Sequence, residues 1–599
     1  MEQYLSYRNV RFVLHEMMDA TSVNRFAYYA DYDRDAYDMA LDAAKQIADT
    51  TMFPFYREMD TKKAIFTEGV VKVHPQLKKI IKAVAEGGWI AGHAPYEAGG
   101  LQMPFTLVYA GLLSFYSANV NACYPFLTQG AANLILSFGS DELKTTYLPN
   151  MYSGDWQGTM ALTEPNAGSS LSDMVTSAEP TDTEGVYKIV GQKIYISGGD
   201  HDAVDNVVHL LLGRIKGAPA GTKGISLFVV PKFRPEGETL VDNNVTTAGI
   251  FGKMGQKGYI AATLMYGEQG DCLGYLVGQP HKGLTYMFQM MNEARIGTGL
   301  VATGAASAAY YASLKYANER PQGRKPSSKS PSDPPVLIVE HADIRRMLLF
   351  QKAVTEGSVA LLLYCSHLAD IAHVAEGEEK TNAHLLQELL TPIAKSYPSE
   401  MGIHAVNAGM QILGGAGYCD DFPLELISRD IRVNAIYEGT TTIHGLDLLG
   451  RKVSMSNGQA VQLFGNELVT EITEGSKLEQ TKPYAQQLGE TAGHLKTITA
   501  KIFENAKTSS PEILLADATM YLDYFSLVTI AWMWLKQGNA AARALEKGNL
   551  SDDDVLFYNS KLATMRYFFE YELPKTLGLE KQLLNFDKLT VGLETAILV

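Results

Sequence analysis

A block of short apolar runs divides this chain, and it restricts the possible folds more than any other feature. Between Met160 and about Leu273, runs such as VYKIV and GISLFVV alternate with turn residues, which is typical of short β-strands. On both sides the apolar residues recur at helical spacing, as in Tyr37 to Ile47 and Leu77 to Val84. We therefore predict a mainly α chain with a central β-domain, either a compact barrel or a sandwich.

The sequence also predicts the organisation of the individual elements. Residues 283–320, 336–375, 381–412 and 428–452 have the pattern of four core helices, and the Pro/Ser-rich segment Arg324 to Pro335 is expected to be an exposed loop. Val186 to Ser197 predicts a hairpin around Gly191. The last region is helical again. The predicted domains are residues 1–158, 159–280, 281–454 and 455–599.

Charge and cysteine content exclude several classes of protein. The 599 residues include 51 basic and 66 acidic side chains, a net charge of -15, which disfavours a general nucleic-acid binder. Four scattered cysteines form no CxxC pair, so we predict reduced, mostly buried thiols and no metal site. The N-terminal sequence has no apolar signal core, and we expect a cytoplasmic protein.

Two uncharged runs need separate consideration as membrane segments. Ile296 to Leu314 is rich in small residues, which predicts a buried bundle helix and not a membrane span. Tyr524 to Leu535 is too short to span a bilayer. It is expected to pack on the core or on a second subunit, and a membrane-surface or partner-binding face is the alternative.

Two segments around the β-block could contact a flat ring. The loop Ala161 to Ser170, with sequence ALTEPNAGSS, offers backbone amides and hydroxyls to a heteroaromatic ring or a phosphate, or it is only a turn and cap. In the run KIYISGG, Tyr195 and Ser197 are two residues apart and would share one strand face. That arrangement suits stacking and hydrogen bonding, although an ordinary core strand has the same pattern.

Two later segments carry glycines and a carboxylate. Gln411 to Tyr418, with sequence QILGGAGY, allows close backbone approach to a ligand, or it is a helix C-cap followed by a turn. In the run AIYEGTTT, Glu438 is a candidate buried base, because desolvation would raise its pKa towards the range needed to accept a carbon-bound proton. A surface carboxylate in a loop is the alternative.

The order and spacing of these four segments resemble the acyl-CoA dehydrogenase family from about residue 35 to residue 452. The motifs that carry the resemblance are TEPNAGS, QILGGAG and IYEGT. The family's fold is a helical domain, a β-barrel and a four-helix bundle, and this chain would add a C-terminal helical domain. That extension resembles a long bacterial subgroup, which includes 3-methylmercaptopropionyl-CoA dehydrogenases and broad fatty acyl-CoA dehydrogenases.

The resemblance implies a FAD-dependent oxidoreductase that desaturates an acyl-CoA thioester to trans-2-enoyl-CoA in fatty acid β-oxidation. Glu438 would take the α-proton while flavin N5 takes the β-hydride, and the electrons would pass to an electron-transfer flavoprotein. A FAD site shared between subunits implies a homo-oligomer, at least a dimer. The alternatives are an acyl-CoA oxidase that uses O₂ and a non-catalytic flavoprotein scaffold.

The resemblance also assigns roles to individual residues. FAD contacts would fall on Leu162, Thr163, Ser169, Tyr195, Ile196, Ser197, Arg320, Gln411, Gly414, Gly415, Thr440 and Thr442. Acyl-CoA contacts would fall on Ser169, Asn292, Arg295 and Gly439. The sequence departs from the family pattern at Ser170, Tyr195, Asn292, Leu426 and the Pro321-Gln322-Gly323 turn.

Overall fold

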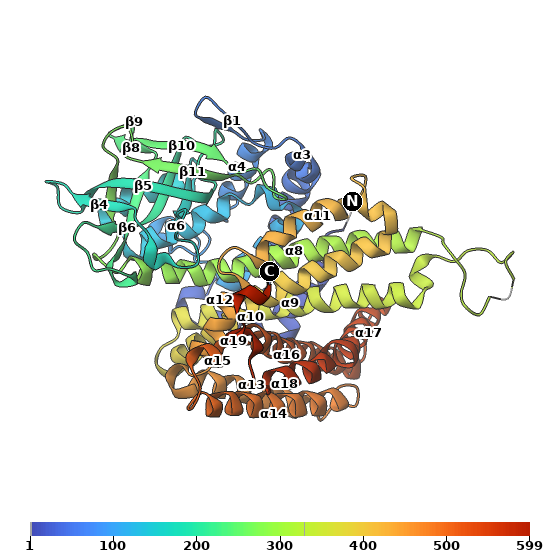
Figure 1. Cartoon of the computed structure of the whole chain (residues 1–599). Coiled ribbons are helices and arrows are strands. Elements are labelled where there is room, and N and C mark those ends of the chain that lie inside the picture. Colours follow the sequence, from blue (N-terminus) through green and yellow to red (C-terminus); the bar gives the residue numbers. More distant parts are fainter. Residues whose placement is uncertain (1–2, 329, 599) are drawn as a thin grey trace. The chain divides into compact units, whose positions relative to one another are not determined.

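The computed structural model describes residues 3–328 and 330–598 and is mostly helical, with a β region that is central in the sequence (Figure 1), which confirms the predicted fold class. The chain divides into two compact units. The first, here called the β unit, comprises residues 35–294. The second, the helical unit, comprises residues 1–34 and 295–599.

In sequence, helices precede and follow the main strands of the β unit. They are α2 (Arg34–Ile47), α3 (Tyr56–Thr61), α4 (Gln76–Glu86), α5 (Phe105–Ala118), α6 (Pro125–Phe138), α7 (Asp141–Tyr152) and the start of α8 (Gly283–Glu319). The helices predicted at residues 37–47 and 77–84 are confirmed as α2 and α4. Helix α4 ends directly before Gly87 and Gly88, the expected stop.

The strands of the β unit form one sheet that closes on itself. Its members are β3 (Trp156–Ala161), β4 (Ser177–Pro180), β5 (Val186–Ser197), β6 (Asn206–Ile215), β7 (Ile225–Pro231), β10 (Val245–Ile250), β11 (Ala261–Tyr266) and β12 (Leu273–Leu276). Two hairpins, β1 (Ile65–Thr67) with β2 (Val70–Lys72) and β8 (Phe233–Glu236) with β9 (Thr239–Asp242), stand apart. Because β4 pairs with both β5 and β6, the ring β5-β12-β7-β6-β4 is closed, as in a small barrel.

The predicted hairpin around Gly191 is wrong. Val186–Ser197 is the single strand β5, which pairs with β12 and β4 in its first half and with β11 in its second half. A Cβ atom at Gly191 would lie 2.4 Å from Thr176 Oγ1 and 2.9 Å from Thr176 Cα. The glycine therefore permits a close approach of two backbones and does not mark a turn.

Long helices build the helical unit, and three of the four predicted bundle helices are confirmed. The bundle contains α8, α9 (Ala342–Val374), α10 (Gly377–Leu413), α11 (Pro423–Ile431) and α12 (Thr441–Asp447). The run Ile296 to Leu314 lies in α8 and is largely buried, as expected. The Pro/Ser-rich connection between α8 and α9 projects from the bundle (Figure 1), and its described residues are mostly exposed.

The single helix predicted over residues 428–452 is wrong. Helix α11 ends at Ile431, a 3-10 turn covers Arg432–Ala435, and α12 begins only at Thr441. Between them, Glu438 and Gly439 have φ angles of 56° and 88°. These left-handed conformations interrupt the helix, so an apolar periodicity that continues through the segment gave the wrong element.

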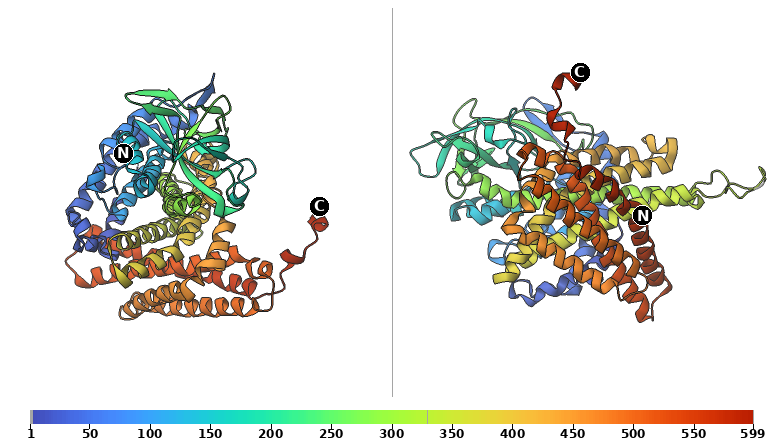
Figure 2. Two further views of the ribbon diagram at one scale, coloured as in Figure 1. Left: turned by 90° about the vertical axis from the view of Figure 1, so that its left-hand side faces the viewer. Right: turned by 60° about the horizontal axis from the view of Figure 1, so that its bottom comes forward.

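A C-terminal helical extension packs against the bundle within the same unit, as Figure 2 shows. Its helices are α13 (Gln459–Gly475), α14 (Lys482–Asn505), α15 (Pro511–Leu515), α16 (Ala518–Lys547), α17 (Asp552–Tyr567), α18 (Thr576–Leu583) and α19 (Leu589–Gly592). Every residue from Tyr524 to Leu535 is buried, and Trp534 Nε1 donates a hydrogen bond to Ala353 O of α9 at 3.0 Å. This burial supports packing on the core and not a membrane-surface face.

Two helical stretches have the length and apolar composition of a membrane crossing, Ala342–Val374 and Pro511–Lys547. In the structure, 72% and 56% of their most apolar windows are buried. Buried core helices have the same composition, so the two stretches are weak evidence for a membrane. The second stretch contains Tyr524 to Leu535 but is longer than that run, so burial, and not the length of the run alone, is the relevant observation.

The cysteines agree with the prediction of reduced, mostly buried thiols. All four cysteines are free; Cys123, Cys272 and Cys365 are buried, and Cys419 is exposed. Cys419 lies just past the 3-10 turn Gly414–Tyr418 at the end of α10, outside the packed helices.

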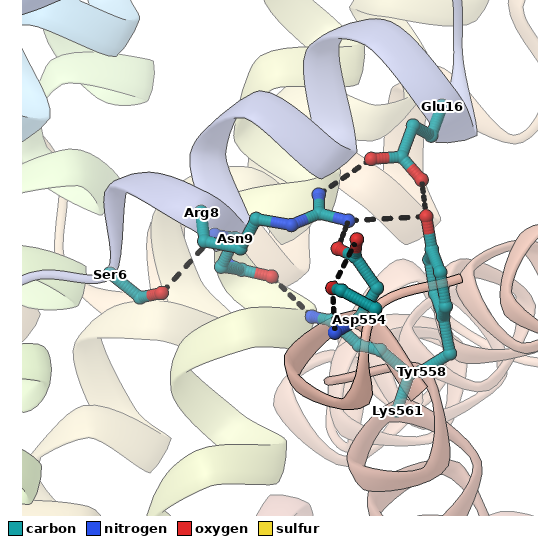
Figure 3. Close-up of polar contacts among 8 residues, drawn as sticks. Ser6, Arg8, Asn9, Glu16, Asp554, Tyr558 and Lys561 are labelled. Atoms are coloured by element: carbon teal, nitrogen blue, oxygen red, sulfur yellow. Dashed lines mark hydrogen bonds and ion pairs between the residues drawn. The ribbon is translucent and has the colours of Figure 1, made fainter. Parts of the chain in front are cut away.

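The N-terminal helix α1 (Tyr7–Phe12) is fastened to α17 by a polar network (Figure 3). Arg8 contacts Glu16 at 2.5 Å, Asp554 at 3.3 Å and the Tyr558 hydroxyl at 3.1 Å. The fully buried Lys561 ammonium donates to Asn9 Oδ1, to Glu356 Oε2 at 2.7 Å and to Gln537 Oε1 at 2.9 Å. One cation thus ties α1, α9, α16 and α17 together.

Lys561→Met should strongly destabilise the protein, because it leaves the Glu356 carboxylate buried with less compensation. Removing one partner of a buried ion pair costs about 3–5 kcal/mol. We expect a clear fall in the midpoint of thermal unfolding. The control is Lys216→Met, which removes a 72% exposed partner of the similarly accessible Glu179 and should change stability by less than about 1 kcal/mol. Equal midpoints for the two variants would contradict the network's importance.

Gly445→Ala should destabilise the contact between α12 and α16. A Cβ atom at Gly445 would lie 2.8 Å from the backbone C and O atoms of Ala518, and backbone atoms cannot move aside as a side chain can. We expect a loss of about 1–3 kcal/mol, read as a lower thermal midpoint. The matched control is Gly465→Ala in α13, where a Cβ atom meets nothing within 4 Å and the helix should gain stability.

Candidate active site

Glu438 stands on a turn that no regular helix could form. The residue lies between the 3-10 turn Arg432–Ala435 and α12, and its φ of 56° is in the left-handed region. This conformation is strained for a residue with a Cβ atom, and such strain is retained chiefly at functional sites. The following Gly439, with φ of 88°, adopts it at little cost and allows the chain to turn into α12.

Burial and two cations act in opposite directions on the Glu438 carboxylate. Burial raises the pKa of Glu438 above its ordinary value, and the charges of Arg295 and Lys395 partly offset this rise. A carboxylate in this environment accepts a proton more readily than an exposed glutamate does. The local electrostatics therefore suit a general base.

The cation from α8 is held inside the protein. Arg295 is 5% exposed, and its Nη1 lies 3.4 Å from Asp447 Oδ2 of α12. Asp447 also pairs with Arg451 Nε at 2.8 Å. The predicted substrate contact Arg295 is thus oriented by α12, the helix that follows the candidate base.

The cation from α10 reaches the turn itself. Lys395 is completely buried, and its Nζ donates a hydrogen bond to Gly439 O at 2.7 Å. Burial lowers the pKa of Lys395 to about 8, with Glu438 and Glu400 opposing that shift. Sequence reasoning missed this residue, because nothing in the run IAKSYPSE marks Lys395 as a neighbour of residue 438.

A neutral histidine completes the turn. His444 Nε2 lies 3.1 Å from Glu438 O, and burial lowers the pKa of His444 to about 3, with Arg295 and Lys395 acting in the same direction. The ring is therefore neutral, and a proton on Nε2 allows it to donate to the Glu438 carbonyl. Thr441 Oγ1 donates to Glu400, so α10 contacts this segment at a second point.

In the β unit, a buried ion pair holds the TEPNAG loop against β5. Glu164 is 3% exposed and lies 2.8 Å from Lys193 Nζ, which also donates to Leu162 O at 2.9 Å. The Glu164 carboxylate further accepts the backbone N–H groups of Val175 and Thr176. Burial lowers the pKa of Lys193 to about 8 against the attraction of Glu164. The sequence did not distinguish these two charged residues as partners.

The first two predicted segments meet along this pair. Thr163 O accepts the backbone N–H of Ile194 at 2.9 Å, which brings Leu162 and Thr163 beside the strand that contains Tyr195, Ile196 and Ser197. Ser169 lies beyond them in the exposed part of the same loop.

Tyr195 does not lie in a regular strand. Its φ is 59°, and the pairing of β5 with β11 shifts register at this point, as at a β-bulge. The simple argument that residues two apart share a face does not hold across such a shift. The Tyr195 ring is 59% exposed and lies 4.3 Å from the Phe251 ring, between centroids, whereas Ile196 is buried.

The remaining predicted residues lie at the ends or middle of long helices. Asn292 is partly buried in α8 beside Glu293, whose pKa burial raises to about 7 against a hydrogen bond from Asn133. Gln411 lies in the last turn of α10, and Gly414 and Gly415 would meet nothing within 4 Å if they carried a Cβ atom.

Arg320 is exposed directly after the last residue of α8. The rings of Tyr316 and Phe422, 5.6 Å apart between centroids, link the end of α8 to the segment that follows the 3-10 turn Gly414–Tyr418. Thr440 and Thr442, by contrast, flank the start of α12 beside Glu438. In the helical unit, the residues predicted to bind FAD thus lie at two places. One is the turn that contains Glu438, and the other is the C-terminal ends of α8 and α10.

Four protein-family models match consecutive parts of the chain. Residues 34–155, 159–267 and 281–453 match the N-terminal, middle and C-terminal domains of acyl-CoA dehydrogenase, and residues 466–594 match the domain called acetyl-CoA dehydrogenase C-terminal like. Together these models match most of the chain, the C-terminal extension included.

Individual relatives agree with the family models along the whole chain. A butyryl-CoA dehydrogenase of Syntrophomonas wolfei is 33% identical, with 96% of each chain covered. A 3-methylmercaptopropionyl-CoA dehydrogenase of Ruegeria pomeroyi is 32% identical, covering 94% of this chain and 95% of the relative.

Solved structures share the fold at lower identity. An acyl-CoA dehydrogenase of Bacillus anthracis complexed with FAD has a TM-score of 0.73 at 20% identity, with 96% of this chain and 91% of that chain covered. The ACDH-11 protein of Caenorhabditis elegans in complex with C11-CoA has a TM-score of 0.75 at 19% identity, with 96% of each chain covered. With matching models in family order and relatives above 30% identity along the full length, this chain belongs to the acyl-CoA dehydrogenase family.

Proposed function

We propose that the protein is a FAD-dependent acyl-CoA dehydrogenase in which Glu438 removes the α-proton of an acyl-CoA thioester. The observation that carries this proposal is the strained turn at Glu438, which holds a carboxylate of raised pKa beside two buried cations. The family membership supplies the class of reaction, and this turn supplies the group that a carbon acid needs.

The reaction needs one group that takes a proton and one that takes a hydride. The Cα–H bond breaks and its proton goes to Glu438, the Cβ–H bond breaks with its electron pair, and a double bond forms between the two carbons. FAD, when bound, supplies the acceptor for the hydride that leaves Cβ. Because the thioester oxygen gains negative charge as the proton leaves, hydrogen-bond donors at that oxygen lower the barrier.

The turn also offers a donor for that oxygen. Among the described residues, no acceptor pairs with the backbone N–H of Glu438, whereas the N–H groups of Ile436 and Tyr437 bond to Val433 O. The left-handed φ of Glu438 removes its N–H from the helical hydrogen-bond pattern. We assign this N–H to the thioester oxygen, next to Gly439 as the predicted substrate contact.

The residues present fit FAD at two kinds of position. The exposed Tyr195 ring offers a flat apolar face on β5, the strand that also carries Ser197 and whose Ile194 N–H bonds to Thr163 O. The open surroundings of Gly414 and Gly415 permit a phosphate or sugar to approach the backbone. Thr440, Thr442, Ile196, Ser169 and the exposed Arg320 and Gln411 complete the proposed contacts.

The acyl chain, the electron acceptor and the assembly are proposals of the same kind. The relatives named for butyryl-CoA and 3-methylmercaptopropionyl-CoA support a short acyl-CoA substrate. An electron-transfer flavoprotein as acceptor, a homodimer and a cytoplasmic location remain predictions. The exposed glycine segment at the end of α10 supports the dimer, because it is accessible to a second subunit.

Anaerobic flavin reduction tests the proposal directly. The purified protein should carry FAD, and a panel of butyryl-, hexanoyl-, decanoyl- and 3-methylthiopropionyl-CoA should bleach its flavin absorbance without O₂, ranking the acyl chains. A colourless protein that binds no added FAD would refute the proposal. Stoichiometric hydrogen peroxide formed in air at the rate of flavin reduction would instead identify an oxidase.

Glu438→Gln should keep FAD and acyl-CoA binding but reduce the rate of flavin bleaching by about 10² or more, since a positioned base contributes about 10²–10⁴-fold. Stopped-flow absorbance measures this rate. The control is Glu425→Gln, which removes a carboxylate of α11 that pairs with Arg429 at 2.9 Å and should bleach at the wild-type rate. Bleaching of Glu438→Gln at the wild-type rate would place the base elsewhere.

The rate of flavin bleaching should rise with pH through a midpoint above 4.5, the ordinary glutamate value. The reactive form of Glu438 is the carboxylate, and burial raises its pKa, so activity is lost as pH falls through this raised value and is kept above it. Stopped-flow rates at saturating acyl-CoA between pH 4.5 and pH 9 check the direction. A rate that stays constant to the lowest of these pH values would contradict it.

A further inference from the structure

Lys395 is unusual among the buried lysines of this protein. Lys193, Lys395, Lys452 and Lys561 are each at most 2% exposed. Lys193 pairs with Glu164 at 2.8 Å, Lys561 pairs with Glu356 at 2.7 Å, and Lys452 pairs with Glu388. Within the residues that the structure describes, Lys395 has no carboxylate within 4.0 Å, and its hydrogen bond goes to the neutral Gly439 carbonyl.

A buried ammonium without a contacting carboxylate is expensive to maintain. Removing a cation from water costs several kcal/mol even after the protein relaxes, and an ion pair normally offsets part of that cost. At Lys395 the offset comes from the Gly439 hydrogen bond and from the more distant charges of Glu438 and Glu400. An apolar residue at this position of α10 would avoid this desolvation cost. Stability therefore does not explain why a positive charge is buried here.

The charged groups around Lys395 come from four helices and the turn. Glu438 and Glu400 attract the ammonium, and Arg295 of α8 repels it. Arg295 is partly neutralised by Asp447 of α12, and His444 of the same helix is neutral. Asp523 of α16 interacts with Glu400, and both effects, burial first, raise its pKa to about 6. Among these groups, the Lys395 ammonium bonds directly to the turn, through Gly439 O.

We propose that Lys395 is the positioning residue of the catalytic base. Its hydrogen bond to the Gly439 carbonyl holds the left-handed turn that aims the Glu438 side chain, and its positive charge favours the ionised form of that carboxylate. The inference rests on the proposed function, because it assigns Lys395 a role through Glu438. Without this cation, only Arg295 would oppose the effect of burial, and more of Glu438 would be protonated near neutral pH.

The test compares the pH dependence of anaerobic flavin bleaching in two variants. Lys395→Gln keeps an N–H donor but removes the charge, and its midpoint should move up by about one pH unit, since a nearby opposite charge lowers a carboxyl pKa by about 1–3 units. Lys395→Arg keeps the charge and should titrate near the wild-type midpoint. FAD content and acyl-CoA affinity, measured on the same preparations, should match the wild type.

The control is Lys452→Gln, which removes another buried ammonium of the same unit, the partner of Glu388. It should lower the thermal unfolding midpoint and leave the pH midpoint of bleaching unchanged. A purely structural role for Lys395 predicts the same behaviour for Lys395→Gln and would overturn the proposal. An equal upward shift in Lys395→Gln and Lys395→Arg would also overturn it, because the charge would not be the cause.

Failure of the inference and failure of the proposed function have different signatures. A wild-type protein whose flavin no acyl-CoA bleaches refutes the function and the inference together. A wild-type protein that bleaches, with Lys395→Gln at the wild-type midpoint, refutes the inference alone. If Lys395→Gln does not fold, Lys395→Met and Lys395→Arg give the same comparison of charge removed and charge retained.

Discussion

The left-handed backbone at Glu438 and Gly439 is the constraint on which the rest of the site depends. It interrupts what would otherwise be a continuous helix and turns a glutamate away from the helical pattern. A strained conformation persists only where the surroundings hold it. Here Lys395 binds the Gly439 carbonyl and His444 lies at the Glu438 carbonyl, so both backbone oxygens of the turn are engaged by side chains.

Those supporting groups are in turn supported by the C-terminal extension. Helix α12 carries His444 and packs on α16 so closely at Gly445 that a methyl group would meet the Ala518 backbone. Helix α16 is buried along its apolar run and also contacts α9 through Trp534. The extension thus belongs to the same compact unit as the base. Through α16 it packs against α12, the helix that follows Glu438.

The β unit applies a similar principle with different groups. The buried Glu164–Lys193 pair holds the loop that follows β3 against β5, so that Leu162, Thr163 and Tyr195 belong to one local structure. The bulge at Tyr195 then exposes its ring, while the neighbouring Ile196 stays in the core. In both units, a residue with a left-handed backbone lies near buried charged groups: Tyr195 near the Glu164–Lys193 pair, and Glu438 near Lys395.

The sequence by itself determined the order of helical and β regions, the acyl-CoA dehydrogenase family and Glu438 as the candidate base, because periodicity and motif spacing are local properties. It gave the wrong element at Gly191 and across residues 428–452, since periodicity does not show where two backbones touch or where a left-handed residue stops a helix. The neighbours of the base, Lys395 and Arg295, come from α10 and α8. Only the tertiary structure showed that both lie near Glu438, because burial and charge proximity arise when distant helices pack together.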